Sequence, residues 1–206
     1  MLAFPYLMTM ITPPTFDVAF IGSGAACSMT LLEMADALLS SPSASPKLRI
    51  AVVERDEQFW CGIPYGQRSS IGSLAIQKLD DFADEPEKAA YRIWLEQNKQ
   101  RWLAFFQAEG GAAAARWICD NRDALDGNQW GELYLPRFLF GVFLSEQMIA
   151  AIAALGERDL AEIVTIRAEA WLWPLAAPRP KPSLRAIPNP HSPISTISTP
   201  PAGRAT

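Results

Sequence analysis

Two glycines and a distant carboxylate are the residues of this chain whose types and spacing could bind a nucleotide. Gly22 and Gly24 directly follow an apolar run at residues 18–21, and Glu54 ends a second run that starts at Arg49. A glycine turn at the start of a helix lets the backbone approach a pyrophosphate, which the positive end of the helix stabilises. A carboxylate at the end of the next strand can accept hydrogen bonds from ribose hydroxyls. The pattern therefore predicts a dinucleotide-binding βαβ unit.

The elements that must position these residues follow from the spacing of the apolar side chains. Residues 18–21 are typical of a strand buried on both faces of a parallel sheet, and residues 49–53 form a second, β-branched run. Between them, apolar residues recur at the spacing of a helix that packs on the sheet: Cys27, Leu31, Met34, Ala35 and Leu38. The pattern predicts an α/β fold with a Rossmann-like βαβ unit.

Two features depart from the usual dinucleotide fingerprint. Cys27 replaces its third glycine, and Glu54 lies farther downstream than the usual distance of about 20 residues. The extra length lies at residues 40–46, a Ser- and Pro-rich loop of the kind that costs little to insert. Because an acid at the end of the second strand repels a 2′-phosphate, FAD or NAD fits better than NADP. A glycine turn in some other α/β domain stays open as the alternative.

A turn-rich loop is expected directly after Glu54, over residues 55–66. Gly62 and Gly66 would let the backbone come close to a ligand there. The aromatic residues Phe59, Trp60 and Tyr65 offer flat surfaces to a ligand, but plain core packing explains them equally well. Both interpretations stay open.

The rest of the chain alternates between helix and strand patterns. We expect helices at 84–106, 112–118 and 134–155, a polar loop at 120–128 and a strand at 163–166. Asp84 would cap the first helix, and Gly156 would follow the last one in the left-handed conformation. This alternation favours a parallel sheet with inserted helices.

The composition is that of a globular protein. The 206 residues are 50% hydrophobic and 19% charged, and no stretch is expected to reach the length of a transmembrane helix. Residues 1–15 are largely apolar, but no Lys or Arg precedes Lys47, so the charged region of a secretory signal is missing. We interpret residues 1–15 as a disordered leader and expect a cytoplasmic protein without a membrane partner.

Charge and cysteine content exclude several kinds of site. The formal net charge of −4 is the sum of −8 over residues 1–170 and +4 over residues 171–206. An acidic body without a basic patch argues against nucleic-acid binding. The three cysteines, odd in number and widely spaced, fit neither a disulfide framework nor a zinc site, so no metal site is predicted.

Residues 171–206 differ in character from everything before them. They hold nine of the 17 prolines and the one histidine, with no acid and no periodicity. One interpretation is a disordered proline-rich tail that binds an SH3-like partner through residues 178–182. The other is out-of-frame translation that leaves the domain truncated. We favour the second, because acids and helical pattern are lost abruptly at Trp171.

Taken together, the motifs resemble the N-terminal part of a bacterial FAD/NAD(P)-binding family of flavoprotein oxidoreductases. Its members carry a glycine-rich βαβ unit, a Glu-Arg pair that ends the second strand, matched by Glu54 and Arg55, and a G-x-x-Y-G loop, matched at residues 62–66. Further matches are an aspartate- and proline-led helix at residues 84–95 and a Y-x-P-R-x-x-F-G segment at residues 134–141. The resemblance covers about residues 16–170, which we take as an FAD/NAD(P)-binding domain.

The resemblance implies FAD as the cofactor and NAD(P)H as a candidate electron source. It implies these cofactor-binding residues: Gly22, Ser23, Gly24, Ala25, Ala26, Glu54, Arg55, Gly62, Tyr65 and Gly66. Residues 67–76 depart from the family segment expected there, which puts the lining of the isoalloxazine side in doubt. Because such proteins continue for hundreds of residues, the domain is expected to be incomplete. No catalytic residue and no substrate can be named.

Three functions therefore compete. The first is an FAD-dependent oxidoreductase domain. The second is a nucleotide-binding or protein-interaction module without catalysis, in which the tail recruits a partner. The third, an NAD-dependent dehydrogenase, fits the βαβ unit but does not account for the motifs at residues 62–66 and 134–141. Flavin binding with a reducible spectrum would separate the first from the second.

Overall fold

A computed structural model describes residues 14–40, 46–81, 85–170 and 185–186. Its parallel strands are β1 (Val18–Ile21), β2 (Leu48–Glu54) and β3 (Ala161–Glu169), in the order β1-β2-β3, and β4 (Arg185–Ala186) pairs antiparallel with the end of β3. The fold is therefore α/β and Rossmann-like, as predicted. The expected leader up to residue 13, the Asp84 cap and nearly all of the tail from residue 171 lie outside the described residues.

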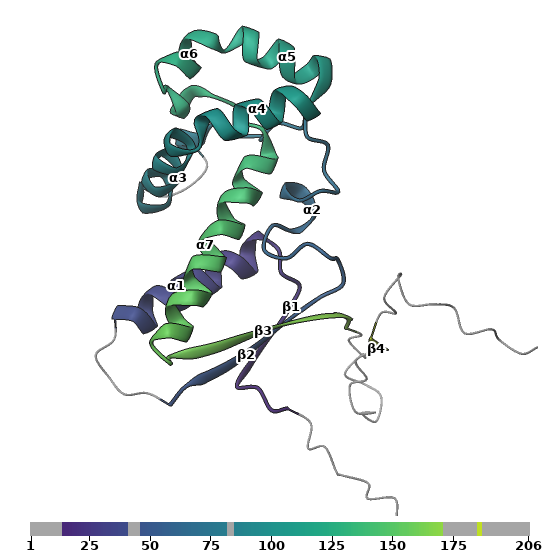
Figure 1. Ribbon diagram of the computed structural model, residues 1–206, viewed down its shortest axis with the longest axis vertical. Coiled ribbons are helices and arrows are strands. Elements are labelled where there is room, and N and C mark those ends of the chain that lie inside the picture. Colours follow the sequence, from purple (N-terminus) through teal and green to yellow (C-terminus); the bar gives the residue numbers. More distant parts are fainter. Residues whose placement is uncertain (1–13, 41–45, 82–84, 171–184, 187–206) are drawn as a thin grey trace, which may run out of the picture.

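One face of the sheet is covered by two helices, α1 (Ala25–Ser40) and α7 (Arg137–Glu157) (Figure 1). Leu31 of α1 and Met148 of α7 are fully buried against Ile50 and Val52 of β2. This apolar layer confirms the predicted packing of the first helix on the sheet. Burial of such side chains is the main favourable contribution to folding of a βαβ unit.

The opposite face of the sheet carries no helix within the described residues (Figure 1). Ile21, which points to that face, is 58% exposed. The prediction that residues 18–21 are buried on both faces is therefore wrong. The reason is tertiary: β1 is the edge strand and pairs on one side alone, with β2.

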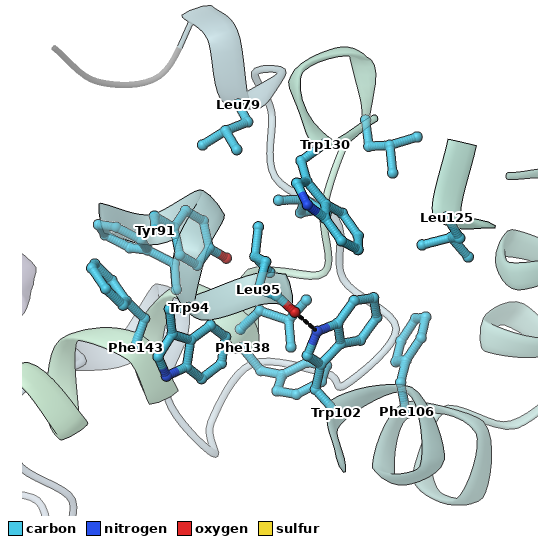
Figure 2. Close-up of a cluster of buried hydrophobic side chains, with 14 of the residues drawn as sticks. Leu79, Tyr91, Trp94, Leu95, Trp102, Phe106, Leu125, Trp130, Phe138 and Phe143 are labelled. Atoms are coloured by element: carbon cyan, nitrogen blue, oxygen red, sulfur yellow. Dashed lines mark hydrogen bonds between the residues drawn. The ribbon is translucent and has the colours of Figure 1, made fainter. Parts of the chain in front are cut away.

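A helical layer lies between β2 and α7 in the sequence and caps the upper half of α7 in space (Figure 1). It comprises α2 (Gly62–Tyr65), α3 (Glu85–Gln97), α4 (Lys99–Glu109), α5 (Gly111–Asp120) and α6 (Arg122–Asp126), with 3₁₀ turns at Leu79–Asp81 and Trp130–Glu132. Its core is rich in aromatic rings that pack edge to face, as Trp102 does on Trp130 (Figure 2). The helix α6 stands where a polar loop was expected at residues 120–128.

The single helix expected at residues 84–106 is two helices that meet at Asn98. In a continuous helix the Leu95 carbonyl would accept the Lys99 backbone N–H. Instead, the buried indole Nε1 of Trp102 donates to the Leu95 oxygen at 3.1 Å (Figure 2). The Asn98 side chain donates to the Trp94 carbonyl at 2.9 Å. The Trp102 bond takes the place of the rung between Leu95 and Lys99 and lets the chain turn, while the Asn98 N–H still donates to the Trp94 carbonyl at 3.0 Å.

The end of α7 also differs from the expectation. Gly156 lies inside the last turn, and Asp159 is the residue with a left-handed backbone, at φ 53°. The Leu160 N–H donates to the Leu155 carbonyl at 3.0 Å and the Asp159 N–H to that of Gly156 at 3.1 Å. This is a Schellman motif, in which Leu160 and Leu155 also pack together. Asp tolerates the left-handed position because its short polar side chain fits there.

The helix α7 is long and apolar enough to cross a membrane, with 21 residues and a mean hydropathy of 1.9 in its most apolar window. The expectation that no stretch reaches this length is therefore wrong. Length and composition do not separate a membrane span from a core helix. Here α7 packs on α1 and β3 and contributes fully buried residues such as Leu139 and Met148 to two cores.

The position of β1 at the edge of the sheet predicts unequal effects of two threonine substitutions. Val52→Thr places a hydroxyl at a position with 0% exposure beneath α1 and α7, and should lower the free energy of unfolding by about 1–3 kcal/mol. Ile21→Thr, at a position of the edge strand with 58% exposure, should lower it by less than about 0.5 kcal/mol. Urea unfolding of both variants measures the difference. Equal losses would show that Ile21 is buried in solution.

Candidate functional site

The glycine turn between β1 and α1 has the backbone that its sequence predicts. Gly22 has φ 91°, a left-handed conformation that a residue with a side chain rarely adopts. Its N–H donates to the Val53 carbonyl at 2.7 Å, which continues the ladder between β1 and β2. The Ser28 N–H then donates to the Gly24 carbonyl at 3.0 Å and opens α1. The turn thus aims the start of α1 at the carboxyl end of the sheet.

Gly24 stands out because the protein itself does not require a glycine there. Its φ is not left-handed, and a Cβ added to it would meet only the Gly62 Cα, at an ordinary contact distance of 3.8 Å. The fold would therefore tolerate a Cβ at this residue, so packing alone does not explain a glycine at the positive end of α1. A side chain there would occupy the place where a diphosphate approaches a helix N-terminus.

Glu54 at the end of β2 binds back to the turn. Its Oε2 accepts the Ser23 N–H at 2.8 Å and the Ser23 hydroxyl at 2.9 Å. Its Oε1 accepts the backbone N–H groups of Arg55 at 2.8 Å and Asp56 at 3.1 Å. Partial burial favours the neutral acid, but these hydrogen bonds stabilise the carboxylate more, so the pKa of Glu54 lies below its usual value.

Two serines of the turn and α1 hold the backbone of Trp60. The Ser28 hydroxyl donates to the Trp60 carbonyl at 2.8 Å, and the Trp60 N–H approaches the Ser23 hydroxyl oxygen at 3.4 Å. Trp60 has φ 76°, which is strained for a residue with a bulky side chain, and its ring is buried on the sheet core. Of the two explanations left open for this aromatic residue, the structure shows core packing.

The glycines of the 62–66 loop make close approaches to protein backbone. Gly62 has φ 64°, and a Cβ there would lie 2.9 Å from the Gly24 Cα. At Gly66 a Cβ would lie 2.6 Å from the Gly62 carbonyl oxygen, and at Gly141 of α7 it would collide with the Tyr65 carbonyl oxygen. The three glycines therefore let α2 fit between the glycine turn and α7. The close approach of Gly141 to the Tyr65 carbonyl also explains why the motif at residues 134–141 ends in a glycine.

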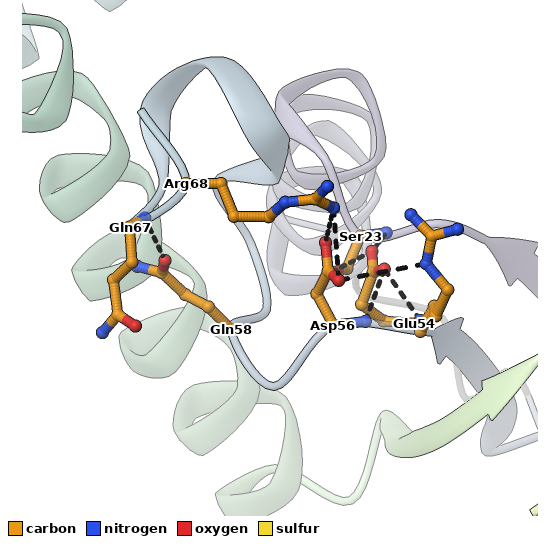
Figure 3. A network of polar contacts seen from close by, with 7 residues as sticks. Ser23, Glu54, Asp56, Gln58, Gln67 and Arg68 are labelled. Atoms are coloured by element: carbon orange, nitrogen blue, oxygen red, sulfur yellow. Dashed lines mark hydrogen bonds and ion pairs between the residues drawn. The ribbon is translucent and has the colours of Figure 1, made fainter. Parts of the chain in front are cut away.

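An open cleft of about 440 Å³ lies at the carboxyl ends of the three parallel strands. It is lined by Gly22, Glu54 to Gln58, Gly62 and Ile63, Gln67 and Arg68, and Ala168 to Ala170, together with Ile21 and Val53. Its charged rim is internally paired: Arg68 binds Asp56 at 3.0 Å (Figure 3), and Arg167 binds Glu57 at 2.9 Å. Ligands of open α/β sheets bind at this edge.

The structure brings some of the expected cofactor-binding residues together and separates others. Those that line the cleft are Gly22, Glu54, Arg55 and Gly62, whereas Ser23 is buried beneath it. Gly24, Ala25 and Ala26 form the start of α1. Tyr65 and Gly66 lie away from the cleft, and the Tyr65 ring packs edge to face on Phe140 in the helical layer.

Sequence reasoning missed several residues that shape the loop after Glu54. The Gln58 side-chain oxygen accepts the Gln67 N–H at 2.7 Å, and Arg68 pairs with Asp56, so both ends of the loop are tied together (Figure 3). Arg68 lies in the segment that departs from the family pattern, and that departure was the available signal. No local sequence pattern marks Ser28, because its hydroxyl donates to the carbonyl of a residue 32 positions away, Trp60.

The cysteines near the site are poor nucleophiles. Burial and the nearby Glu54 charge raise the pKa of Cys27 to about 11, and they raise the pKa of the fully buried Cys61 as well. Cys61 is thus a small structural residue. Among the described residues, no group of three or more His, Cys, Asp and Glu side chains is placed to hold a metal ion.

Comparison with known proteins agrees with this geometry. A family model described as FAD-NAD(P)-binding matches residues 19–171, which includes the turn, the loop after β2, all the inserted helices and β3. No solved structure matches the chain.

The lowered pKa of Glu54 gives the folded state a pH dependence. The charged form is stabilised in the folded protein, so its contribution is full above the usual pKa of the group and is lost as the pH falls through the lower folded value. The free energy of unfolding should therefore fall between about pH 5 and pH 3 more steeply than in Glu54→Gln. Urea unfolding across this window measures both slopes. Identical slopes would mean that Glu54 makes no such contacts in solution.

Alkylation should distinguish the cysteines under native conditions. Iodoacetamide at about pH 8 should modify the exposed Cys119 first, because only about 0.1% of a thiol with a pKa near 11 is ionised there. Cys27 and Cys61 should react only after denaturation. Peptide mass spectrometry gives the order of modification, with a urea-denatured sample as the control. Rapid labelling of native Cys61 would contradict its burial.

Proposed function

This chain belongs to the FAD-NAD(P)-binding family, and from that premise we propose that it is a flavoprotein oxidoreductase domain that holds FAD at its glycine turn. The observation that carries the proposal is Gly24 itself, a glycine at a position where neither φ nor protein packing requires one. A bound ligand explains the glycine, because the methyl group of an alanine at this position would keep the ligand away from the backbone. The start of α1 supplies the positive potential that a diphosphate needs.

The proposed roles of the other residues follow from their positions. Gly22 makes the turn, the N–H groups at Gly24 to Ala26 face the phosphates, and the cleft beside Arg55 receives the adenosine end. When bound, FAD would supply the electron-transfer chemistry, with NAD(P)H as the electron donor in this proposal. The chain's own part is to bind and orient the cofactor. The described residues include no histidine and no acid–base pair at the cleft that would add catalysis of their own.

A nucleotide-binding module without catalysis is the second candidate. The cleft favours it in one respect, because charged residues on its rim, Asp56 with Arg68 and Glu57 with Arg167, are paired with one another. Residues that are paired in this way are engaged with the protein itself and not with a substrate. For either candidate we propose a cytoplasmic location, supported by the three free cysteines. Nucleic acid is not proposed as a partner, given the formal net charge of −4.

The substitution Gly24→Ala tests the proposed site. It should weaken FAD binding by about tenfold or more, because the methyl group stands where the diphosphate approaches. The fold should tolerate it, with a change in the free energy of unfolding of less than about 1 kcal/mol. Gly156→Ala in α7 is the matched control: it meets open space, should raise stability by about 0.5–1 kcal/mol, and should leave FAD affinity unchanged. Fluorescence titration with FAD measures affinity for both variants.

Flavin spectroscopy on the full chain separates the two candidate functions. After incubation with FAD and desalting, retained flavin absorbance that bleaches on addition of NADH or NADPH would support the oxidoreductase. Retained flavin that neither nicotinamide reduces would support the binding module. A colourless protein with no affinity for FAD would overturn the proposed use of the site.

A further inference from the structure

A second groove, which we call the helical groove, lies between α1, α3 and α7 and has a volume of about 570 Å³. Among the described residues, none lines both this groove and the cleft at the carboxyl ends of the strands. Its lining includes buried apolar side chains, the first three of them labelled in Figure 2: Leu79, Tyr91, Phe143 and Leu144. The last turns of α7 add small residues: Ala150, Ala151 and Ala154. A groove of this size and lining suits a small organic molecule.

One carboxylate oxygen in the helical groove is buried without a partner. Oε2 of Glu87, in the first turn of α3, accepts no hydrogen bond within the described part of the chain. The two cations of α3 are engaged elsewhere. Lys88 donates to the Asp80 carbonyl at 3.1 Å and pairs with Glu85 at 3.0 Å, and Arg92 pairs with Asp80. Because a buried acceptor without a donor is unfavourable, a ligand that donates to Oε2 would be stabilised here.

The charges of the helical groove favour a positively charged ligand. Glu33 and Asp36, both exposed on α1, line it together with Glu87, and Lys88 is the one cation in its described lining. Three carboxylates and one engaged ammonium group attract cations and repel anions. A metal ion is not the match, since no group of three or more His, Cys, Asp and Glu side chains among the described residues could hold one.

An organic ammonium ion meets each of these conditions. Its N–H groups can form with Glu87 Oε2 the charge-assisted hydrogen bond that this oxygen lacks. The aromatic ring of Tyr91 attracts a cation that lies over its face. The apolar lining can bury a hydrocarbon body. A neutral apolar molecule would leave Oε2 unpaired, and an anion would be repelled.

We propose that the helical groove is a second ligand site, which binds a primary amine with an apolar body, and that Glu87 Oε2 accepts a hydrogen bond from its ammonium group. The groove and the cleft have separate linings, so the two sites can be filled at the same time. The inference therefore stands whether or not FAD binds at the glycine turn.

The first test compares three ligands that share a phenethyl body and differ in the head group, by ligand-observed NMR on the full chain at about pH 7. Phenethylamine should bind with a Kd of about 1 mM or below. Phenethyltrimethylammonium keeps the charge but has no N–H to donate, so it should bind about tenfold more weakly or worse. Hydrocinnamate, an anion, should show no binding. Equal affinities for the two cations, or no binding of phenethylamine, would overturn the inference.

Substitutions test where the amine binds. Glu87→Gln removes the charge and should weaken phenethylamine binding by about tenfold or more. Glu96→Gln is the matched control: it removes the same charge from an exposed position of α3 outside the groove lining, and should change affinity by less than about twofold. Ala150→Phe, at an exposed lining position of α7, should narrow the groove and weaken binding by about tenfold. Wild-type affinity in both groove variants would place the amine elsewhere and overturn the inference.

Two other occupants of the helical groove would give different results in the same experiments. If a second copy of the chain or the basic residues 171–206 took the groove, the wild type would not bind phenethylamine, and the inference would fail. Sedimentation velocity then separates these two occupants, because only a second copy produces a dimer.

Discussion

The close contact between Gly24 and Gly62 is the constraint on which the candidate site depends. Two backbones meet there with no room for a side chain on Gly62, whose missing Cβ would lie 2.9 Å from the Gly24 Cα. Because of this contact, the loop after β2 folds over the glycine turn, and α2 lies between the turn and α7. Glu54 accepts a hydrogen bond from the turn, at Ser23, and Ser28 donates one to the same loop, at Trp60. Turn, loop and helix therefore form one unit beside the cleft.

The long helix α7 joins this unit to the rest of the molecule. Its first half contributes Leu139 and Phe143 to the aromatic core of the helical layer, and its second half contributes Met148 and Leu155 to the cores beside α1 and the sheet. Gly141, in the first half, lets α2 come into contact. The helices α3 to α6 thus stabilise the element against which the loop is placed, although they lie at the end of α7 away from the sheet (Figure 1).

The βαβ unit and its helix could be predicted from the sequence because their signals are local. An apolar run, a glycine and a 3.6-residue period each depend on neighbours in the chain. The break at Asn98 could not be predicted, because it needs the Trp102 indole to take the Leu95 carbonyl within a packed core. The exposure of Ile21 depends on which strand stands at the edge of the sheet, and sequence pattern does not encode strand order.

By itself, the sequence determined that a glycine turn opens a helix at the end of a strand, and that the chain belongs with FAD-NAD(P)-binding proteins. Only the tertiary structure decided what the other motif residues do. Glu54 binds Ser23, 31 residues away, and the glycines at 62, 66 and 141 approach protein backbone. The physical reason is that spacing limits which donors and acceptors can meet, whereas the folded chain selects which of them become partners.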